Sequence, residues 1–243
     1  EEAKVQFAHT FSNERVNAAI VQQKKDAETN TNVPQGDASL EQAVYGVYAR
    51  KDIVHPDGKT GVIYKAGEQV GTLTTDKEGK ARIENLYLGE YFVKEITPPV
   101  GYLADENEYD LVCSYEGDLV ATVERDCTSP EQVKKQPFQI IKAANNGNTD
   151  AALLEGAGFT DYLVSSLTVK EDGTYDFDSA TPVVLGENGA TEIFTDKKGY
   201  AVSIPLPYGT YVVRETTTPH NYKPVDDFIV RITEHKPTEP QVW

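Results

Sequence analysis

The sequence has 243 residues and a formal net charge of −16, with 39 Asp and Glu against 23 Lys and Arg. This balance argues against nucleic acid and against insertion into anionic membranes, because phosphate-rich partners require clustered cations, and no apolar run reaches the roughly 18–20 residues that span a membrane. The length and the many Pro, Gly, Tyr and β-branched residues predict an all-β chain of two domains, each about 120 residues long.

The first half of the chain reads as short strands separated by turns. Strands are expected over residues 16–25, 40–49, 70–75 and 81–86, followed by the strand that carries Glu95. Residues 107–115 and 119–126 are expected to pair as a hairpin around Gly117. Residues 1–13 contain a short alternating stretch, so residues 1–15 are interpreted as the last strand of a preceding domain or as a linker.

The second half repeats this organisation after a polar stretch, residues 129–136, which has no apolar periodicity and is interpreted as a linker. Strands are expected over residues 138–142, 153–164, 183–185, 193–195, 200–204, 210–215 and 228–232, with the start of another at 241–243. We therefore expect one domain over residues 16–133 and a second over 134–243 that lacks its final strand. The chain is interpreted as a piece of a longer array.

A strict internal repeat relates the two halves. Residues 91–102 read YFVKEITPPVGY and residues 211–222 read YVVRETTTPHNY, at a constant offset of 120 positions. The offset means two copies of one structural unit. Glu95 and Glu215 fall on the strand face that also carries apolar or aromatic residues, so each carboxyl is expected to point into a core, where an unpartnered acid is costly.

Each unit also places a lysine among the inward residues of its first strand. Lys142 has the same parity as Phe138 and Ile140, and Lys24 takes the corresponding place in the first unit. Burial penalises the charged forms of both side chains, which favours a nucleophilic neutral amine and a carboxyl that can carry a proton. Each lysine is therefore a candidate nucleophile, and each glutamate is a candidate proton donor or acceptor beside it.

The pattern LxxGxYxVxExxxPxxY, a preceding TDxxGxA turn and a lysine-bearing first strand occur in both units. Together they resemble the B-type repeat domain of Gram-positive surface proteins, that is, the collagen-adhesin B-type and SpaA-type pilin modules. The resemblance covers nearly all of residues 16–243. It implies two tandem transthyretin-like (prealbumin-like), Ig-like β-sandwich domains. It also implies an autocatalytic isopeptide bond between a first-strand lysine and a last-strand Asn or Asp, assisted by a buried Glu.

The resemblance assigns the crosslinking lysines as Lys24 and Lys142 and the assisting acids as Glu95 and Glu215. For Lys142 it implies an acceptor on a strand beyond Trp243. The alternative reading is that each Lys and Glu forms only a buried ion pair or hydrogen bond.

The acceptor of the first unit departs from the family pattern. The spacing of 11 residues from Asn13 to Lys24 recurs from Glu131 to Lys142, so Glu131 stands where the family has Asn. Asp126 is the nearest alternative acceptor, and the absence of a bond is the other interpretation. Asn13 is then the orphan acceptor of a preceding unit.

The implied function is a structural stalk or repeat region of a sortase-anchored adhesin or pilin, secreted and anchored to the cell wall of a Gram-positive bacterium. Neighbouring repeat domains are the expected partners, with no cofactor, no metal and no turnover enzyme. The alternative is an adhesin module that binds host protein or glycan through Tyr175 and Phe177. The surplus strand at residues 1–13 also predicts donor-strand contact between chains.

Cys113 and Cys127 are 14 residues apart and lack metal-binding spacing. A disulfide in an oxidising compartment and two separate thiols are both compatible with the sequence.

Overall fold

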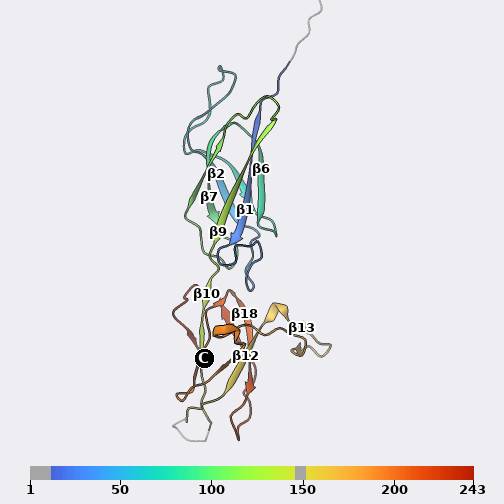
Figure 1. The fold of residues 1–243 in the computed structure, drawn as a ribbon, viewed down its shortest axis with the longest axis vertical. Coiled ribbons are helices and arrows are strands. Elements are labelled where there is room, and N and C mark those ends of the chain that lie inside the picture. The colour runs from blue at the N-terminus through green and yellow to red at the C-terminus, as the bar shows by residue number, and fades with distance from the viewer. Residues whose placement is uncertain (1–11, 146–151) are drawn as a thin grey trace, which may run out of the picture.

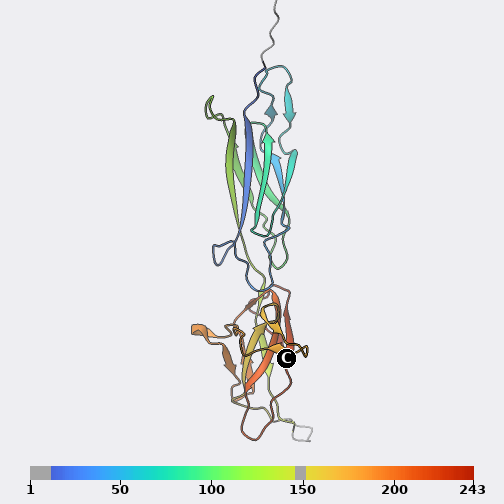
Figure 2. The same cartoon turned by 90° about the vertical axis from the view of Figure 1, so that its right-hand side faces the viewer.

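A computed structural model describes residues 12–145 and 152–243 and shows two β-sandwich units stacked along one long axis (Figures 1 and 2). The two helices in the described part are the three-residue 3-10 turns η1 (Val164–Ser166) and η2 (Glu187–Gly189). The predicted all-β class is therefore confirmed. The strand expected within residues 1–13 lies almost entirely outside the described residues.

The first unit consists of two facing sheets. The three-stranded sheet has the order β6 (Lys80–Leu86), β1 (Asn17–Asp26), β9 (Thr122–Glu131), and the four-stranded sheet has the order β5 (Gln69–Thr74), β2 (Val44–Ala49), β7 (Gly89–Thr97), β8 (Glu108–Cys113). A small hairpin joins β3 (Ile53–Val54) to β4 (Val62–Tyr64). Strands β1 and β9 run parallel over ten residues, while the other pairs of this unit are antiparallel.

The second unit repeats the same arrangement, with shorter strands in its three-stranded sheet. Its sheets are β16 (Tyr200–Val202), β11 (Phe138–Ile141), β20 (Gln241–Val242) and β15 (Glu192–Phe194), β12 (Gly158–Leu163), β18 (Gly209–Thr217), β19 (Phe228–Ile232). The additional pairs are β10 (Lys135–Gln136) with β17 (Leu206–Pro207) and β13 (Thr168–Val169) with β14 (Tyr175–Asp176). Strand β20 lies parallel to β11, as β9 lies parallel to β1.

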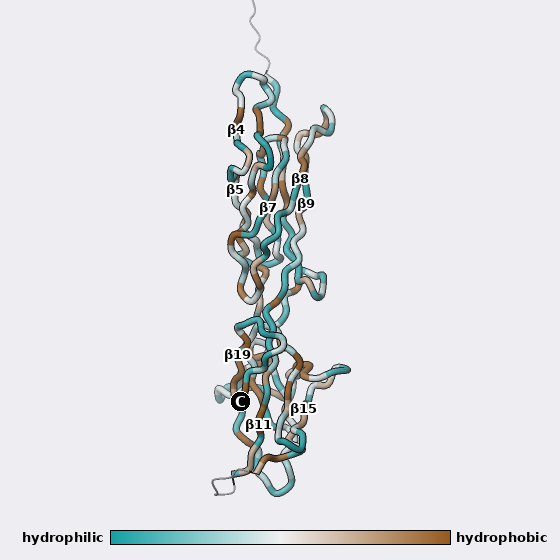
Figure 3. The backbone as a smooth tube through the Cα atoms, turned by 90° about the vertical axis from the view of Figure 1, so that its left-hand side faces the viewer, coloured by the Kyte–Doolittle hydropathy of each residue, from teal (hydrophilic) through white to brown (hydrophobic). Residues whose placement is uncertain are grey.

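Side-chain alternation explains which residues reach the interior. Successive residues of a strand point to opposite faces, and along β1 the residues of one parity, from Ala18 to Asp26, are buried. The buried residues of β1 change from Ala18 and Ile20 at its start to Gln22 and Lys24 near its end. The first sandwich is thus apolar at one end and polar at the other, next to the second unit. Figure 3 shows apolar and polar stretches along the strands of both units.

Three expectations about the strands were wrong. Strand β8 pairs with β7, whereas β9 belongs to the opposite sheet beside β1, so residues 107–126 form no hairpin. The stretch expected as a linker is also largely built into the fold, because β9 extends to Glu131 and β10 pairs with β17. Residues 183–185 lie outside any strand, although the Val183 N–H donates to the Asp161 carbonyl at 2.8 Å.

The two units meet through a small, tightly packed junction. Tyr208 of the second unit packs against four buried residues of the first, which are Ala38, Leu40, Tyr102 and Val133. The Asp37 carboxylate accepts a hydrogen bond from the Thr210 N–H at 2.9 Å, and the Asp37 N–H donates to the Tyr208 carbonyl at 2.9 Å. Backbone hydrogen bonds therefore continue across the boundary between the sandwiches.

Candidate functional site

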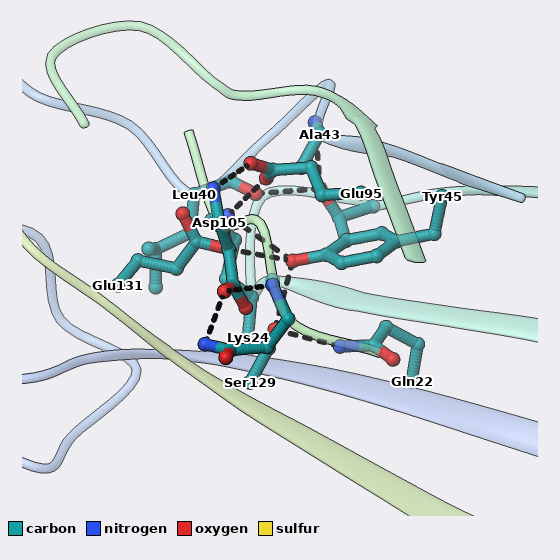
Figure 4. Close-up of polar contacts among 12 residues, drawn as sticks. Gln22, Lys24, Leu40, Ala43, Tyr45, Glu95, Asp105, Ser129 and Glu131 are labelled. Atoms are coloured by element: carbon teal, nitrogen blue, oxygen red, sulfur yellow. Dashed lines mark hydrogen bonds and ion pairs between the residues drawn. The ribbon is translucent and has the colours of Figure 1, made fainter. Parts of the chain in front are cut away.

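A buried lysine, two glutamates and a tyrosine meet at the polar end of the first sandwich (Figure 4). The Lys24 side chain is fully buried, and its Nζ lies 2.8 Å from Glu95 Oε1 and 3.1 Å from Tyr45 Oη. Glu131 Oε1 contacts the same Nζ, and the Glu131 side chain is also fully buried. Lysine, both acids and the phenol come from four different strands, β1, β7, β9 and β2.

A chain of hydrogen bonds orients the phenol of Tyr45. The Gln22 amide donates to Ser129 Oγ at 2.8 Å, Ser129 Oγ lies 2.8 Å from Tyr45 Oη, and Tyr45 donates to Glu131 Oε1 at 2.9 Å. On the other side of the lysine, Glu95 Oε2 accepts the backbone N–H of Asp105 at 2.8 Å. Each acid is thus held at one oxygen by a donor other than lysine.

The cluster contains more acid than base. One ammonium, that of Lys24, faces two buried carboxyl groups. Burial raises the pKa of Glu131 to about 7, an effect that the attraction of Lys24 opposes and the nearby charge of Glu95 reinforces. Burial and the charge of Glu131 also raise the pKa of Tyr45, so its phenol remains a proton donor. Near neutral pH both the acid and the carboxylate form of Glu131 are therefore populated.

The second unit repeats half of this site. Lys142 Nζ lies 2.7 Å from Glu215 Oε2, and the same oxygen accepts the Val225 N–H at 2.7 Å. Val225 follows Glu215 by as many residues as Asp105 follows Glu95. Both Lys–Glu pairs therefore include a backbone N–H from the segment after the strand, which binds the second oxygen of Glu95 but the lysine-bound oxygen of Glu215.

The second site differs in its aromatic residue and in its last strand. Phe159 pairs with Glu215 in the register in which Tyr45 pairs with Glu95, so the second site has no phenol at this place. Strand β20 pairs with β11 at Phe138 and Gln139 and ends before it reaches the level of Lys142. A pocket there is lined by Lys142, Phe159 and the ring of Trp243.

The remaining predicted residues lie away from the lysines. Asp126 is exposed on the outer face of β9, opposite in parity to the buried Cys127, so the structure does not bring it to Lys24. Asn13 is exposed and precedes β1, whereas Lys24 lies near the other end of that strand. Spacing placed Glu131 at the acceptor position of the family, where it is interpreted as a departure. Sequence reasoning missed Tyr45, which contacts Glu131, and the residues Ser129 and Gln22 behind it, because strand pairing brings them together.

The aromatic residues of the 165–182 loop are half-buried and not fully exposed. The Phe177 ring lies 5.1 Å from that of Tyr162, and the Arg214 guanidinium lies 3.9 Å from the Phe177 centroid. A shallow pocket beside the ring of Tyr175 also includes Lys170. Phe177 thus contributes mainly to packing of its own unit.

Three further observations concern metal ligands, membrane-spanning helices and cysteines among the described residues. Among them, no group of three or more His, Cys, Asp or Glu side chains is arranged to hold a metal ion. No helix in residues 12–145 and 152–243 is long and apolar enough to cross a membrane. Cys113 and Cys127 are free, buried thiols, and burial raises the pKa of Cys127 to about 12, which suppresses the reactive thiolate.

Fold and site together define a class of tandem prealbumin-like β-sandwiches with one buried Lys–Glu pair in each. The chain belongs to the SpaA family of prealbumin-like fold domains, which matches residues 18–126 and again residues 136–242. No curated protein sequence gives a significant match.

Solved structures that match this chain include three bacterial proteins. The Bacillus anthracis TIE protein has a TM-score of 0.59 and 20% identity, over 93% of this chain and 33% of that chain. GBS52, the minor pilin of Streptococcus agalactiae, has a TM-score of 0.36 and 19% identity over 94% of both chains. The shaft pilin SpaA of Lactobacillus rhamnosus GG has a TM-score of 0.31 and 17% identity, over 93% of this chain and 95% of that one. This chain spans about a third of the TIE protein, and the likeness to that protein shows the fold alone.

Proposed function

We propose that this chain is a structural stalk segment of a secreted adhesin or pilin, anchored by sortase to the wall of a Gram-positive bacterium. In this proposal, Lys24 forms an isopeptide crosslink that ties the first strand of the first unit to its last, and Glu95 assists. Lys142 and Glu215 are the equivalent pair of the second unit, for an acceptor that an added strand would bring. The observation that carries it is the pair of buried Lys–Glu contacts, built alike in two units of one family.

The geometry supports a single bond-forming event and not turnover. Burial holds Lys24 and Glu95 in contact without competing water, which replaces much of the entropic and solvation barrier that an enzyme would otherwise lower. A product amide remains in the core and leaves no free site. Neighbouring repeat units are the partners that such a segment requires, and the packed junction at Tyr208 supports this assignment.

Crosslinking is tested by migration in SDS after boiling. The wild-type chain is compared with Lys24→Met and Glu95→Gln, with Lys25→Met as the matched control on the neighbouring, outward position of β1. A chain with a covalent link between β1 and β9 stays compact in detergent, so wild type and Lys25→Met are expected to run ahead of Lys24→Met and Glu95→Gln. Equal migration of all four would reject crosslinking in the first unit.

Binding of host protein or glycan is the second candidate function. The pocket beside the β13–β14 hairpin combines Tyr175 with Lys170 and Arg214, groups that suit polar ligands. The test is a glycan and matrix-protein array with wild type, Tyr175→Ala and Phe177→Ala. Saturable binding lost in Tyr175→Ala supports the module, and an empty array rejects it.

Donor-strand contact between chains is a finer proposal about partners. The pocket at Lys142 next to β20 is suited to an added strand from a second molecule, which would bring an acceptor such as Asn13. Sedimentation at high protein concentration tests this proposal. A strictly monomeric chain would exclude it.

A further inference from the structure

Glu131 occupies the position from which Lys24 can be acylated. Its side chain is fully buried, and its Oε1 contacts Lys24 Nζ and accepts the Tyr45 hydroxyl. Its other oxygen, Oε2, is buried and has no hydrogen-bond partner among the residues that the structure describes. A buried carboxyl oxygen without a partner is costly. The Glu131 carboxyl group therefore lies against the amine, with one oxygen held by lysine and phenol and the other oxygen unbonded.

We propose that Lys24 Nζ and Glu131 Cδ form an isopeptide bond, so that a glutamate serves as the acceptor in the first unit. This inference rests on the proposed crosslinking function and specifies its acceptor chemistry. Glu131 takes the role of acceptor in place of Asp126, which lies on the outer face of β9.

Strand register explains why glutamate reaches the amine. In the parallel ladder Lys24 pairs with Ser129, and Glu131 is two residues further along β9 on the same inward face. A diagonal neighbour on one face lies within reach of long side chains. Both Lys24 and Glu131 have such side chains, and they meet over the shorter Ser129.

The reaction balances without any external reactant. One proton passes within the cluster from the Lys24 ammonium to the Glu131 carboxylate, which leaves a neutral amine and a carboxylic acid. The amine attacks Cδ, and Glu95 takes the proton that the nitrogen loses. Glu95 then returns this proton to the departing Glu131 hydroxyl, the Cδ–Oε2 bond breaks, and water leaves. The products are one amide and one water molecule, and Glu95 is restored.

Tyr45 supplies the hydrogen bond that this mechanism needs at Oε1. As the amine adds, negative charge develops on that oxygen, where an oriented donor in a dry site stabilises the transition state. The donor is held by Ser129 and, through it, by Gln22. A carboxylic acid is a poor acyl donor, so polarisation of its carbonyl oxygen has a direct effect on the rate.

The second unit shows that this donor chain is not a general requirement of the fold. Phe159 takes the register position of Tyr45, and Ile140, two residues before Lys142, takes that of Gln22. The Tyr45 hydroxyl and the Gln22 amide are therefore present in the first unit, where the inward residue of the last strand is Glu131. Bond formation also reduces the number of buried charges from three to one, because the amide is neutral.

Intact-mass spectrometry of the full chain, followed by sequencing of the branched peptide, tests the proposal. Wild type is expected to be lighter than its sequence mass by about 18 Da, the water lost on acyl transfer to lysine, with the branch joining Lys24 to Glu131. Glu131→Gln keeps the geometry and is expected to lose about 17 Da as ammonia. Glu131→Ala is expected to retain its full mass, with circular dichroism as the check on folding.

The role of Tyr45 is tested by the rate of the mass loss after refolding. Tyr45→Phe is expected to slow it by about 100-fold, as loss of one oxyanion donor does. Tyr48→Phe, which alters a half-buried tyrosine of the same strand, is the matched control and should react at the wild-type rate. An unchanged rate in Tyr45→Phe would overturn this role.

The outcomes separate this inference from the wider function. A branch from Lys24 to Asp126 would overturn the Glu131 acceptor but leave a crosslinked stalk segment intact. Full mass in a folded wild-type chain, together with wild-type SDS migration equal to that of Lys24→Met, would overturn both proposals for the first unit.

Discussion

Two buried acids in this protein have different surroundings. Glu131 faces a lysine and a phenol, whereas the Asp161 carboxyl group is fully buried and has no hydrogen-bond partner among the described residues. Burial alone raises the pKa of Asp161 to about 8. In the first unit Val47 takes the corresponding register position, opposite Val93 as Asp161 is opposite Val213. An acid thus occupies a place that suits an aliphatic side chain.

The substitution Asp161→Val is expected to stabilise the second unit by about 1–3 kcal/mol at pH 7, because it removes an unsatisfied buried polar group. In the wild type, the folded state holds the Asp161 proton up to about pH 8 while the unfolded state releases it near 3.8. Stability should therefore fall as the pH rises from about 4 to 8 and then level off. Trp243, the single tryptophan, contacts Phe228 and reports unfolding of this unit.

The control for this prediction is Val47→Ile, an apolar change at the matching site of the first unit. It should leave the pH dependence of the tryptophan-detected transition unchanged. A wild-type transition that is flat between pH 5 and 9, or one equally steep in Asp161→Val, would contradict the assignment.

For single residues, the sequence predicted which side chains point into the core but not which residues they contact there. Alternation placed Lys24, Lys142, Glu95 and Glu215 on the core face, and the structure has all four side chains buried. The error with Asp126 has a physical cause. A hairpin was assumed where β9 crosses to the other sheet, and the face of a strand has meaning only once its partner strand is known. The hydroxyl chain from Gln22 to Tyr45 depends on the same long-range pairing.

At the scale of elements, one glycine turn in each unit positions the lysine strand. Gly79 and Gly199 have φ values of +73° and +71°, and their carbonyls accept the N–H groups of Lys24 and Lys142, both at 2.8 Å. A Cβ on Gly199 would lie 2.6 Å from the Lys142 carbonyl oxygen. Both backbone conformation and space therefore require glycine.

The substitution Gly199→Ala is expected to destabilise the second unit by about 1–2 kcal/mol of backbone strain plus about 1–3 kcal/mol of overpacking. Gly173→Ala is the matched control in the same unit, since Gly173 has φ of +83° but open space around it. It should show the strain alone. Urea unfolding followed by Trp243 fluorescence measures the free energy of unfolding of both variants. An equal decrease in the two would show that the close approach of Gly199 to Lys142 does not contribute to stability.

Most strands could be predicted because short alternating runs bounded by turn residues are a local signal. The pairing of β1 with β9 could not, because nearly a hundred residues separate them and parallel neighbours leave no turn between them. The linker was mispredicted for a related reason. Residues 129–136 look polar because the inward side chains of β9 at its end are Ser129 and Glu131, which belong to the site.

For the whole molecule, the junction determines whether the two units behave as one body. Tyr208 packs against the buried cluster of the first unit, and its carbonyl accepts the Asp37 N–H at 2.9 Å. Gly101 and Gly36 approach Tyr208 so closely that a Cβ on either would clash with it. The contact therefore depends on one aromatic side chain and small neighbours.

The substitution Tyr208→Ala is expected to uncouple the units without unfolding either. The rotational correlation time from nitrogen relaxation should fall by about a factor of two, toward that of a single domain, because small interdomain contacts permit relative motion by default. Tyr222→Ala, at an exposed tyrosine of the second unit, is the control and should tumble like the wild type. Unchanged tumbling in Tyr208→Ala would show that the backbone hydrogen bonds suffice.

The parallel pairing of β1 with β9 has a mechanical consequence. The chain enters the first sandwich at the start of β1 and leaves it at the end of β9, at opposite ends of one ladder ten residues long (Figure 1). A pull on the two termini therefore loads these hydrogen bonds in shear, all at once, and does not peel them one by one. Lys24 and Glu131 lie near the exit, so a bond between them would transmit the tension past the intervening residues and leave the rest of the sandwich unstretched.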